Sequence, residues 1–110
     1  MAYDEQLADR IRSELAGVDG VSERKMFGGI AFMVHGNMTV GIVGRDLMVR
    51  VGPDRWEPAL RRAHAREMDF TGRSMKGFVY VGERGTRRAD ALRRWIRMGL
   101  DHAESLPRKG

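Results

Sequence analysis

Four short segments with strand character, joined by connections of three residues, constrain the fold of this chain more than any other feature. They run over 21–26, 30–34, 38–43 and 47–51. Two of the connections are His35-Gly36-Asn37 and Gly44-Arg45-Asp46, and glycine and asparagine suit the positive φ of tight turns. A parallel crossover needs about a dozen residues or more, so these connections allow only antiparallel neighbours. The sequence therefore predicts an antiparallel meander from 21 to 51.

A helix is predicted before this meander. Leu7, Ile11 and Leu15 recur at four-residue spacing, which places them on one face of a helix over 5–16. Asp4 precedes that segment, and its carboxylate can accept hydrogen bonds from the free amides of the first turn. We therefore expect Asp4 to cap the helix.

Two more helices are predicted in the second half of the chain. Asp54 and Glu57 have the spacing of a capping box, which predicts a short helix over 54–65. The last helix is expected over 87–104, with Thr86 as its N-cap. It is amphipathic, because its apolar residues recur at helical spacing.

The segment between these two helices completes the predicted fold. Residues 68–76 are polar and contain glycine, which indicates a loop that can start with a short strand. One further strand is predicted over residues 77–81. The order of elements is then α-β-β-β-β-α-β-α. The economical packing is a two-layer α+β fold, in which an antiparallel sheet carries its helices on one face.

Length and composition limit the class of protein. The chain has 110 residues and no cysteine, which fits one domain and excludes disulfides, thiolate metal sites and cysteine nucleophiles. Its start has neither a basic nor an apolar segment of a secretory signal, and no apolar stretch reaches the roughly 20 residues of a membrane span. We therefore expect a cytoplasmic protein that does not enter a membrane.

The charge is unevenly distributed along the chain. Residues 1–60 carry 7 Lys or Arg and 9 Asp or Glu, a net charge of −2, whereas residues 61–110 carry 13 and 6, a net charge of +7. A basic half can attract an anionic partner such as nucleic acid. An arginine-rich, solvated surface explains the same composition, and the sequence leaves both readings open.

Several motifs together resemble a known family. They are Lys25-Met26-Phe27-Gly28-Gly29-Ile30-Ala31-Phe32, Gly36-Asn37-Met38, Leu47-Met48-Val49-Arg50-Val51-Gly52-Pro53 and Met68-Asp69-Phe70-Thr71-Gly72-Arg73-Ser74-Met75-Lys76-Gly77. The chain resembles the N-terminal domain of the TfoX/Sxy proteins, bacterial regulators of natural competence. The resemblance covers nearly the whole chain and implies a single TfoX N-terminal-like domain over 1–110, in a stand-alone copy. It also implies an α+β fold and a role in transcription regulation, and it supplies no catalytic residues and no cofactor.

Two regions are candidates for contact with an anion or with nucleic acid. The loop Gly72-Arg73-Ser74-Met75-Lys76-Gly77 carries Arg73, Lys76 and a hydroxyl between glycines, so it can bind a small anion. A solvated connection whose Met75 fills the core is the alternative.

The last helix is the second candidate. It offers a stripe of cations, namely Arg87, Arg88, Arg93, Arg94 and Arg97. Asp90 stands four residues before Arg94, and Asp101 four after Arg97, so acidic neighbours can neutralise part of the stripe. Arg87 and Arg88 lie where the helix dipole disfavours cations, and an anion bound there would relieve the conflict.

Signals of catalysis or metal binding are weak. The serines lack a nucleophile-elbow context, and His64 with Glu67 is one pair where zinc needs three or four ligands. The eight methionines suit irregular core gaps, although methionine also serves adaptable binding surfaces. We therefore expect neither an enzyme nor a metal or cofactor site.

Three functions remain as hypotheses. The first is a non-catalytic regulatory module that presents a sheet edge or a methionine-rich surface to another protein. The second is direct binding of nucleic acid through the arginine-rich last helix together with Arg73 and Lys76. The third, weaker, is binding of a small anion at the loop over 72–77. A homodimer is compatible with the sequence, and the oligomeric state stays open.

Overall fold

The structure, a computed structural model, describes residues 3–26, 28–70 and 73–109, without the side chains of Phe70 and Arg73. Its elements are α1 (Glu5–Glu14), β1 (Val21–Met26), β2 (Gly29–Val34), β3 (Asn37–Val43), β4 (Asp46–Arg50), η1 (Pro53–Arg55), α2 (Trp56–Leu60), β5 (Ala65–Phe70), β6 (Arg73–Val81), η2 (Glu83–Gly85) and α3 (Ala89–Glu104). None of the described helices is both long enough and apolar enough to cross a membrane.

One antiparallel sheet organises the chain, with strand order β1-β2-β3-β4-β6-β5. The predicted meander is confirmed, because β1 to β4 pair as consecutive antiparallel neighbours. Strand β6 then pairs with β4, with Leu47 opposite Val81, and β5 pairs with the far side of β6. The two edges of the sheet are therefore β1 and β5.

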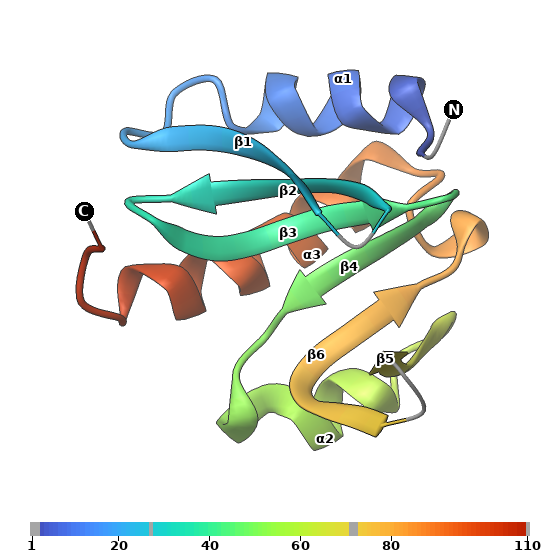
Figure 1. The fold of residues 1–110 in the computed structure, drawn as a ribbon. Helices are drawn as coiled ribbons and strands as arrows, with labels where there is room; N and C mark the ends of the chain where they lie inside the picture. The colour runs from blue at the N-terminus through green and yellow to red at the C-terminus, as the bar shows by residue number, and fades with distance from the viewer. Residues whose placement is uncertain (1–2, 27, 71–72, 110) are drawn as a thin grey trace.

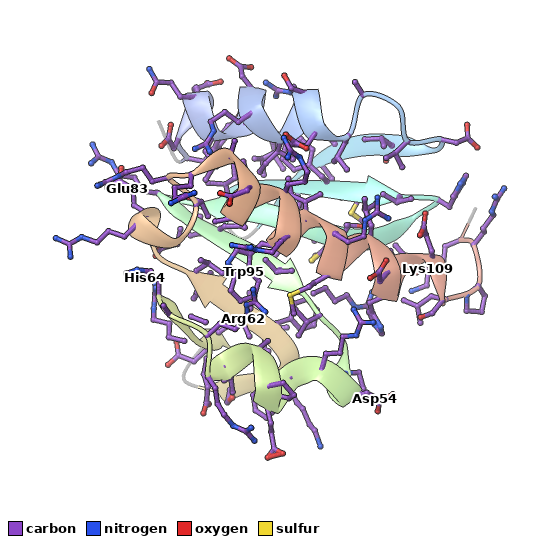
Figure 2. The ribbon with its side chains drawn as sticks, turned by 180° about the vertical axis from the view of Figure 1, so that it is seen from behind. Asp54, Arg62, His64, Glu83, Trp95 and Lys109 are labelled. Carbon is purple, nitrogen blue, oxygen red and sulfur yellow. The ribbon has the colours of Figure 1, made fainter. Side chains whose placement is uncertain are left out.

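The three helices lie on one face of this sheet. Figure 1 shows α3 behind β2, β3 and β4, with α1 near the β1 end and α2 near β5 and β6. The view from behind in Figure 2 places α3 in front of the strands. The predicted α+β class and order of elements are confirmed, with the last predicted strand extended into a hairpin of two strands.

The main core fills the space between the helices and the sheet. It includes Phe32 and Ile42 from the strands and Ile11, Leu92 and Ile96 from the helices, all at most 2% exposed. Residues two apart on a strand share a face, so alternate residues of the meander point to this core. Each such side chain contributes about 1.5–3 kcal/mol relative to exposure, which is what holds α1 and α3 against the sheet.

The opposite face of the sheet is built from the alternate residues of the same strands. Met33, Met48 and Met68 are buried. Arginines extend over the aromatic rings of β6 on this face, with Arg50 lying 5.6 Å from the ring centroid of Phe78. The prediction that methionines fill core gaps is confirmed for these three. They leave little methionine-rich surface, and Val21 is the one large apolar side chain counted as exposed in the part of the chain that the structure describes.

The segment predicted as a loop is a β-hairpin. Residues 68–70 lie in β5 and residues 73–76 in β6, while Gly72 falls outside the described residues. The ladder pairs Asp69 with Ser74 and shifts register between Glu67 and Asp69. The prediction was wrong because pairing of β6 with β4, across some thirty residues of sequence, decides this structure, and polar composition does not reveal such pairing.

The helix boundaries differ from those predicted in the second half of the chain. Helix α2 covers Trp56–Leu60 and has no side-chain cap, so the predicted capping box is wrong. Thr86 does not cap α3, because its hydroxyl donates to the carbonyl of Glu83 at 3.2 Å. Asp4 does cap α1, since it accepts from the amide nitrogens of Gln6 and Leu7 at 3.0 and 3.2 Å.

The C-terminal segment after α3 is tied to the sheet. The amide nitrogen of Lys109 donates to the carbonyl of His35 at 2.8 Å. The side-chain nitrogen of Asn37 donates to the carbonyl of Pro107 at 2.9 Å. Because His35 and Asn37 flank the turn between β2 and β3, the residues after α3 fasten this turn.

Candidate functional site

The arginines of α3 lie among carboxylates. Arg93 donates to Glu14 of α1 at 3.1 Å, and Arg88 donates to Asp90 at 3.2 Å. Arg97 lies 3.8 Å from Asp101, the pair that the sequence predicted. Each of these three cations therefore has an acidic neighbour, which weakens the field of the predicted stripe.

These ion pairs shift the pKa values of exposed groups. The hydrogen bond from Arg88 lowers the pKa of Asp90 below its ordinary value. The hydrogen bond to Glu14 raises the pKa of Arg93. Both pairs are solvent-exposed, and exposed pairs typically contribute little to stability. Their main effect is to pair these side chains with each other, and their contribution to the stability of the fold is small.

Arg87 occupies a different position, just before α3. Its side chain is exposed and makes no ion pair with the residues described. Its backbone carbonyl accepts from Arg10, which also donates to the carbonyl of Thr86 at 2.7 Å. Arg10 therefore anchors the start of α3 to the middle of α1.

The cations of the predicted loop lie elsewhere. Lys76 is exposed in the first half of β6, and α3 begins beyond the other end of that strand. The side chain of Arg73 lies outside the described residues. The hydroxyl of Ser74 donates to Glu67 across the hairpin at 2.6 Å. The five predicted site residues whose side chains are described do not form one patch: Arg87 and Arg88 lie together, Arg93 and Arg97 share a helix face, and Lys76 is apart.

A hollow beside the C-terminal half of α3 brings together a histidine, two carboxylates and a serine. Its lining includes Asp54, Asp101, His102 and Ser105, and its volume is about 270 Å³. The hydroxyl of Ser105 donates to the backbone carbonyl of His102 at 2.6 Å, so it is not directed at the imidazole. Arg55 donates to Asp101 at 3.2 Å. These contacts do not form a nucleophile activated by a base.

The imidazole of His102 is nevertheless perturbed. Burial lowers its pKa below the ordinary 6.5, and the nearby charge of Arg50 lowers it further. The ring lies against the backbone of Gly52, which has φ +88 and leaves no room for a Cβ. The neutral imidazole therefore serves as a packing group between α3 and the end of β4.

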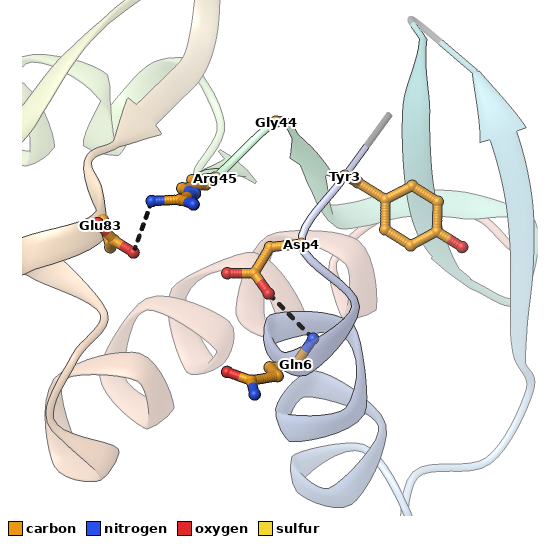
Figure 3. A pocket seen from close by; sticks show the side chains of 6 residues that line it. All are labelled: Tyr3, Asp4, Gln6, Gly44, Arg45 and Glu83. Carbon is orange, nitrogen blue, oxygen red and sulfur yellow. Dashed lines mark hydrogen bonds and ion pairs between the residues drawn. The ribbon is translucent and has the colours of Figure 1, made fainter. Parts of the chain in front are cut away.

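A polar hollow of about 470 Å³ lies at the start of the chain (Figure 3). It combines the beginning of α1, the turn between β3 and β4, and η2. Arg45 lies 3.9 Å from Glu83, and Asp4 is engaged as the cap of α1. Sequence reasoning missed this hollow, because its walls come from three segments that no local pattern links.

A second hollow, of about 490 Å³, lies between the α1–β1 connection and the end of α3. Apolar side chains line it, among them Val18, Leu100 and Leu106. Arg97 and Arg108 at its rim are accompanied by the carboxylates Asp19 and Glu104, so its charges balance. The formal charges of this second hollow therefore do not favour a ligand of one sign.

The edge strand β1 has the clearest asymmetry. Among the described residues it forms a ladder with β2 alone, and Val21 to Lys25 are exposed. Arg12 of α1 donates twice to Glu23, at 2.7 and 2.9 Å, and this hydrogen bonding lowers the pKa of Glu23. Arg24 and Lys25 make no ion pair within the described part of the chain. The edge therefore offers free backbone groups together with unneutralised positive charge.

No group of three or more potential metal ligands occurs in the described ranges 3–26, 28–70 and 73–109. A family model described as the TfoX N-terminal domain matches residues 13–103. The chain belongs to this family. The match spans β1 to β6 and most of α3 of the TfoX N-terminal domain. Searches of curated proteins and of solved structures gave no match.

Proposed function

We propose that this TfoX N-terminal domain is a non-catalytic module that acts through contacts with another protein. The observation that carries the proposal is the edge strand β1, whose backbone pairs on one side alone within the described part of the chain and whose side chains from Val21 to Lys25 are exposed. Unpaired edges are sites where an extended segment of another chain can add a strand. Transcription regulation, the role implied by the resemblance to the TfoX/Sxy regulators, is the setting in which such a contact would act.

The side chains able to do chemistry support the same proposal. Ser105 donates to a backbone carbonyl, Ser74 donates to Glu67, and Asp101 is held by arginines. A nucleophilic mechanism needs a nucleophile in contact with its base, and these groups are committed to other partners.

Binding of nucleic acid through α3 is the competing function. It requires a field of cations that phosphates can neutralise. Arg88, Arg93 and Arg97 each have a carboxylate within 4 Å, which favours protein contact over this alternative.

Affinity capture with and without nuclease tests the proposal. We expect the tagged protein to retain the same partner proteins after nuclease treatment, and to bind duplex DNA weakly even at low salt. Charge reversal by Arg93→Glu with Arg97→Glu serves as the control, because it removes α3 cations and leaves β1 intact. We expect this variant to retain the partners.

Two results would contradict the proposal. Recovery that disappears with nuclease, together with salt-sensitive DNA binding lost in the α3 variant, would assign nucleic acid as the partner. If no protein is retained even under gentle crosslinking, the proposed protein contact is rejected.

A further inference from the structure

The edge of the sheet at β1 carries an inference about the chemistry of the partner, and it rests on the proposed protein-binding function. The six residues Val21–Met26 pair with β2 in an unbroken register, Val21 with Val34 through Met26 with Gly29. No backbone hydrogen bond joins them to any other described segment. In Figure 1 this strand forms the outer border of the sheet on the side of α1.

The two sides of β1 differ in charge. Because side chains alternate, Glu23 and Lys25 point toward the helices, and Ser22 and Arg24 toward the other face. Glu23 pairs with Phe32, whose side chain belongs to the helix-side core, which fixes this assignment. With Glu23 neutralised by Arg12, one free cation remains on each face of the strand.

We propose that β1 accepts an extended acidic segment of a partner protein as an additional antiparallel strand. The added strand places one carboxylate opposite Lys25 on the helix side and the next opposite Arg24 on the other side. An apolar residue three positions after the second carboxylate lies opposite Val21, which is 36% exposed. The recognised pattern is therefore two consecutive acidic residues, two polar residues and one apolar residue.

A second copy of this chain fits the edge poorly. A two-fold axis perpendicular to the sheet that runs between the two copies, level with the middle of β1, brings either Glu23 opposite Glu23 or Arg24 opposite Arg24. Like charges directly opposite each other destabilise a pair of strands. In the second register Lys25 faces Glu23 of the other copy, but Arg12 already binds that carboxylate twice. Arg24, which disfavours the second register, is one of the two cations that favour an acidic partner.

Synthetic peptides test the inference directly. The probe contains Thr-Glu-Glu-Thr-Thr-Val with blocked ends. One control replaces both glutamates by lysine, and the other replaces the fourth residue by proline, which interrupts the ladder. We expect amide chemical-shift changes on residues 21–26 with the probe, and far weaker binding of both controls. Binding of the probe is expected to weaken when salt exceeds about 0.1 M, because exposed charges are then screened.

Charge reversal in the protein supplies the second readout. In the double variant Arg24→Glu with Lys25→Glu, the dissociation constant of the probe is expected to rise about tenfold, since two favourable cross-strand pairs become unfavourable. The lysine peptide should then bind the variant better than it binds the original protein. Arg94→Glu, an exposed position of α3 without an ion pair in the described residues, is the matched control and should change neither affinity.

The results separate this inference from the proposed function. Equal binding of the acidic and lysine peptides, or shifts located outside β1, would overturn the inference. If partner proteins are captured equally by the original protein and by the double variant, the acidic strand is rejected while protein binding stands. If a symmetric dimer forms through β1, the argument against self-pairing is wrong.

Discussion

Single residues in this domain act mainly through the space and the charges around them. Gly29 and Gly41 lie where strands approach closely, because a Cβ on Gly29 would meet the carbonyl oxygen of Ile42 and one on Gly41 would meet Met48. His102 is a packing group whose protonation is opposed by burial and by Arg50. Stability at this scale therefore depends on close contact as well as on apolar area.

Gly29→Ala is expected to lower the free energy of unfolding by about 1–3 kcal/mol, because the added methyl group overpacks the backbone of β3. Gly17→Ala is the matched control, since no atom lies within 4 Å of its added Cβ and its φ is not positive. We expect the control to stay within about 0.5 kcal/mol of the original protein. Urea unfolding of both variants measures the difference, and equal stability would contradict the assigned contact.

The histidine predicts a dependence of stability on pH. The folded pKa of His102 lies below its unfolded value of 6.5, so the unfolded chain binds the proton more tightly. The stabilisation is therefore complete above pH 6.5 and is lost as the pH falls through the folded pKa. We expect the free energy of unfolding to fall less in His102→Gln than in the original protein when the pH is lowered from 7.5 to about 5.5. Urea unfolding at both pH values measures this difference. An unchanged pH profile would mean that His102 does not titrate differently on folding.

Sequence alone reveals only part of this residue scale. It predicted the cap Asp4 and the pair Arg97–Asp101, because both depend on neighbours within one helix. It could not predict that Arg93 meets Glu14, since these residues are 79 positions apart. The hollows were missed for the same reason.

Whole elements follow local rules where the connections are short. The short turns predicted the antiparallel meander, and the spacing of Leu7 and Ile11 predicted α1. Helix α2 and strand β5 were mispredicted because the residues from Ala65 on pair with β6, and β6 itself is placed by its pairing with β4, which is distant in the sequence. The composition of β5 is largely polar, as in a loop, and pairing with the neighbouring strand makes this segment a sheet edge.

The cap of α1 gives a prediction at this scale. Asp4→Ala removes the acceptor of two first-turn amides and is expected to lower the free energy of unfolding by about 1 kcal/mol. Glu5→Ala is the matched control, because it removes an exposed carboxylate from the same turn without removing the cap. Thermal unfolding of the two variants decides the prediction. A larger loss in the control would assign the effect to charge at the helix end.

At the scale of the whole molecule, segments near both ends of the sequence make hydrogen bonds to distant elements. Arg10 ties α1 to the start of α3, and the residues after α3 fasten the turn between β2 and β3 through His35 and Asn37. The helix layer and the sheet are thus connected at several distant points of the chain. We therefore expect the loss of one of these hydrogen bonds to destabilise an element distant in the sequence.

Removal of residues 107–110 tests this connection. The deletion eliminates the acceptor of Asn37 and the donor to His35, and we expect a loss of about 1–2 kcal/mol for two hydrogen bonds. Hydrogen exchange should become faster at the turn between β2 and β3. Arg108→Ala with Lys109→Ala keeps the backbone bonds and should remain close to the original protein. An equal loss in both would attribute the effect to charge.

The position of β6 between β4 and β5 has a consequence for synthesis of the chain. A ribosome releases β1 to β4 first, and local contacts allow this half to assemble early. Until residues up to Val81 have emerged, β4 is a temporary border whose Leu47 and Val49 have a neighbouring strand on the β3 side alone. The nascent polypeptide is therefore most prone to aggregate in this interval. The late arrival of β6 closes that border and leaves the charged β1 as one of the two permanent ones.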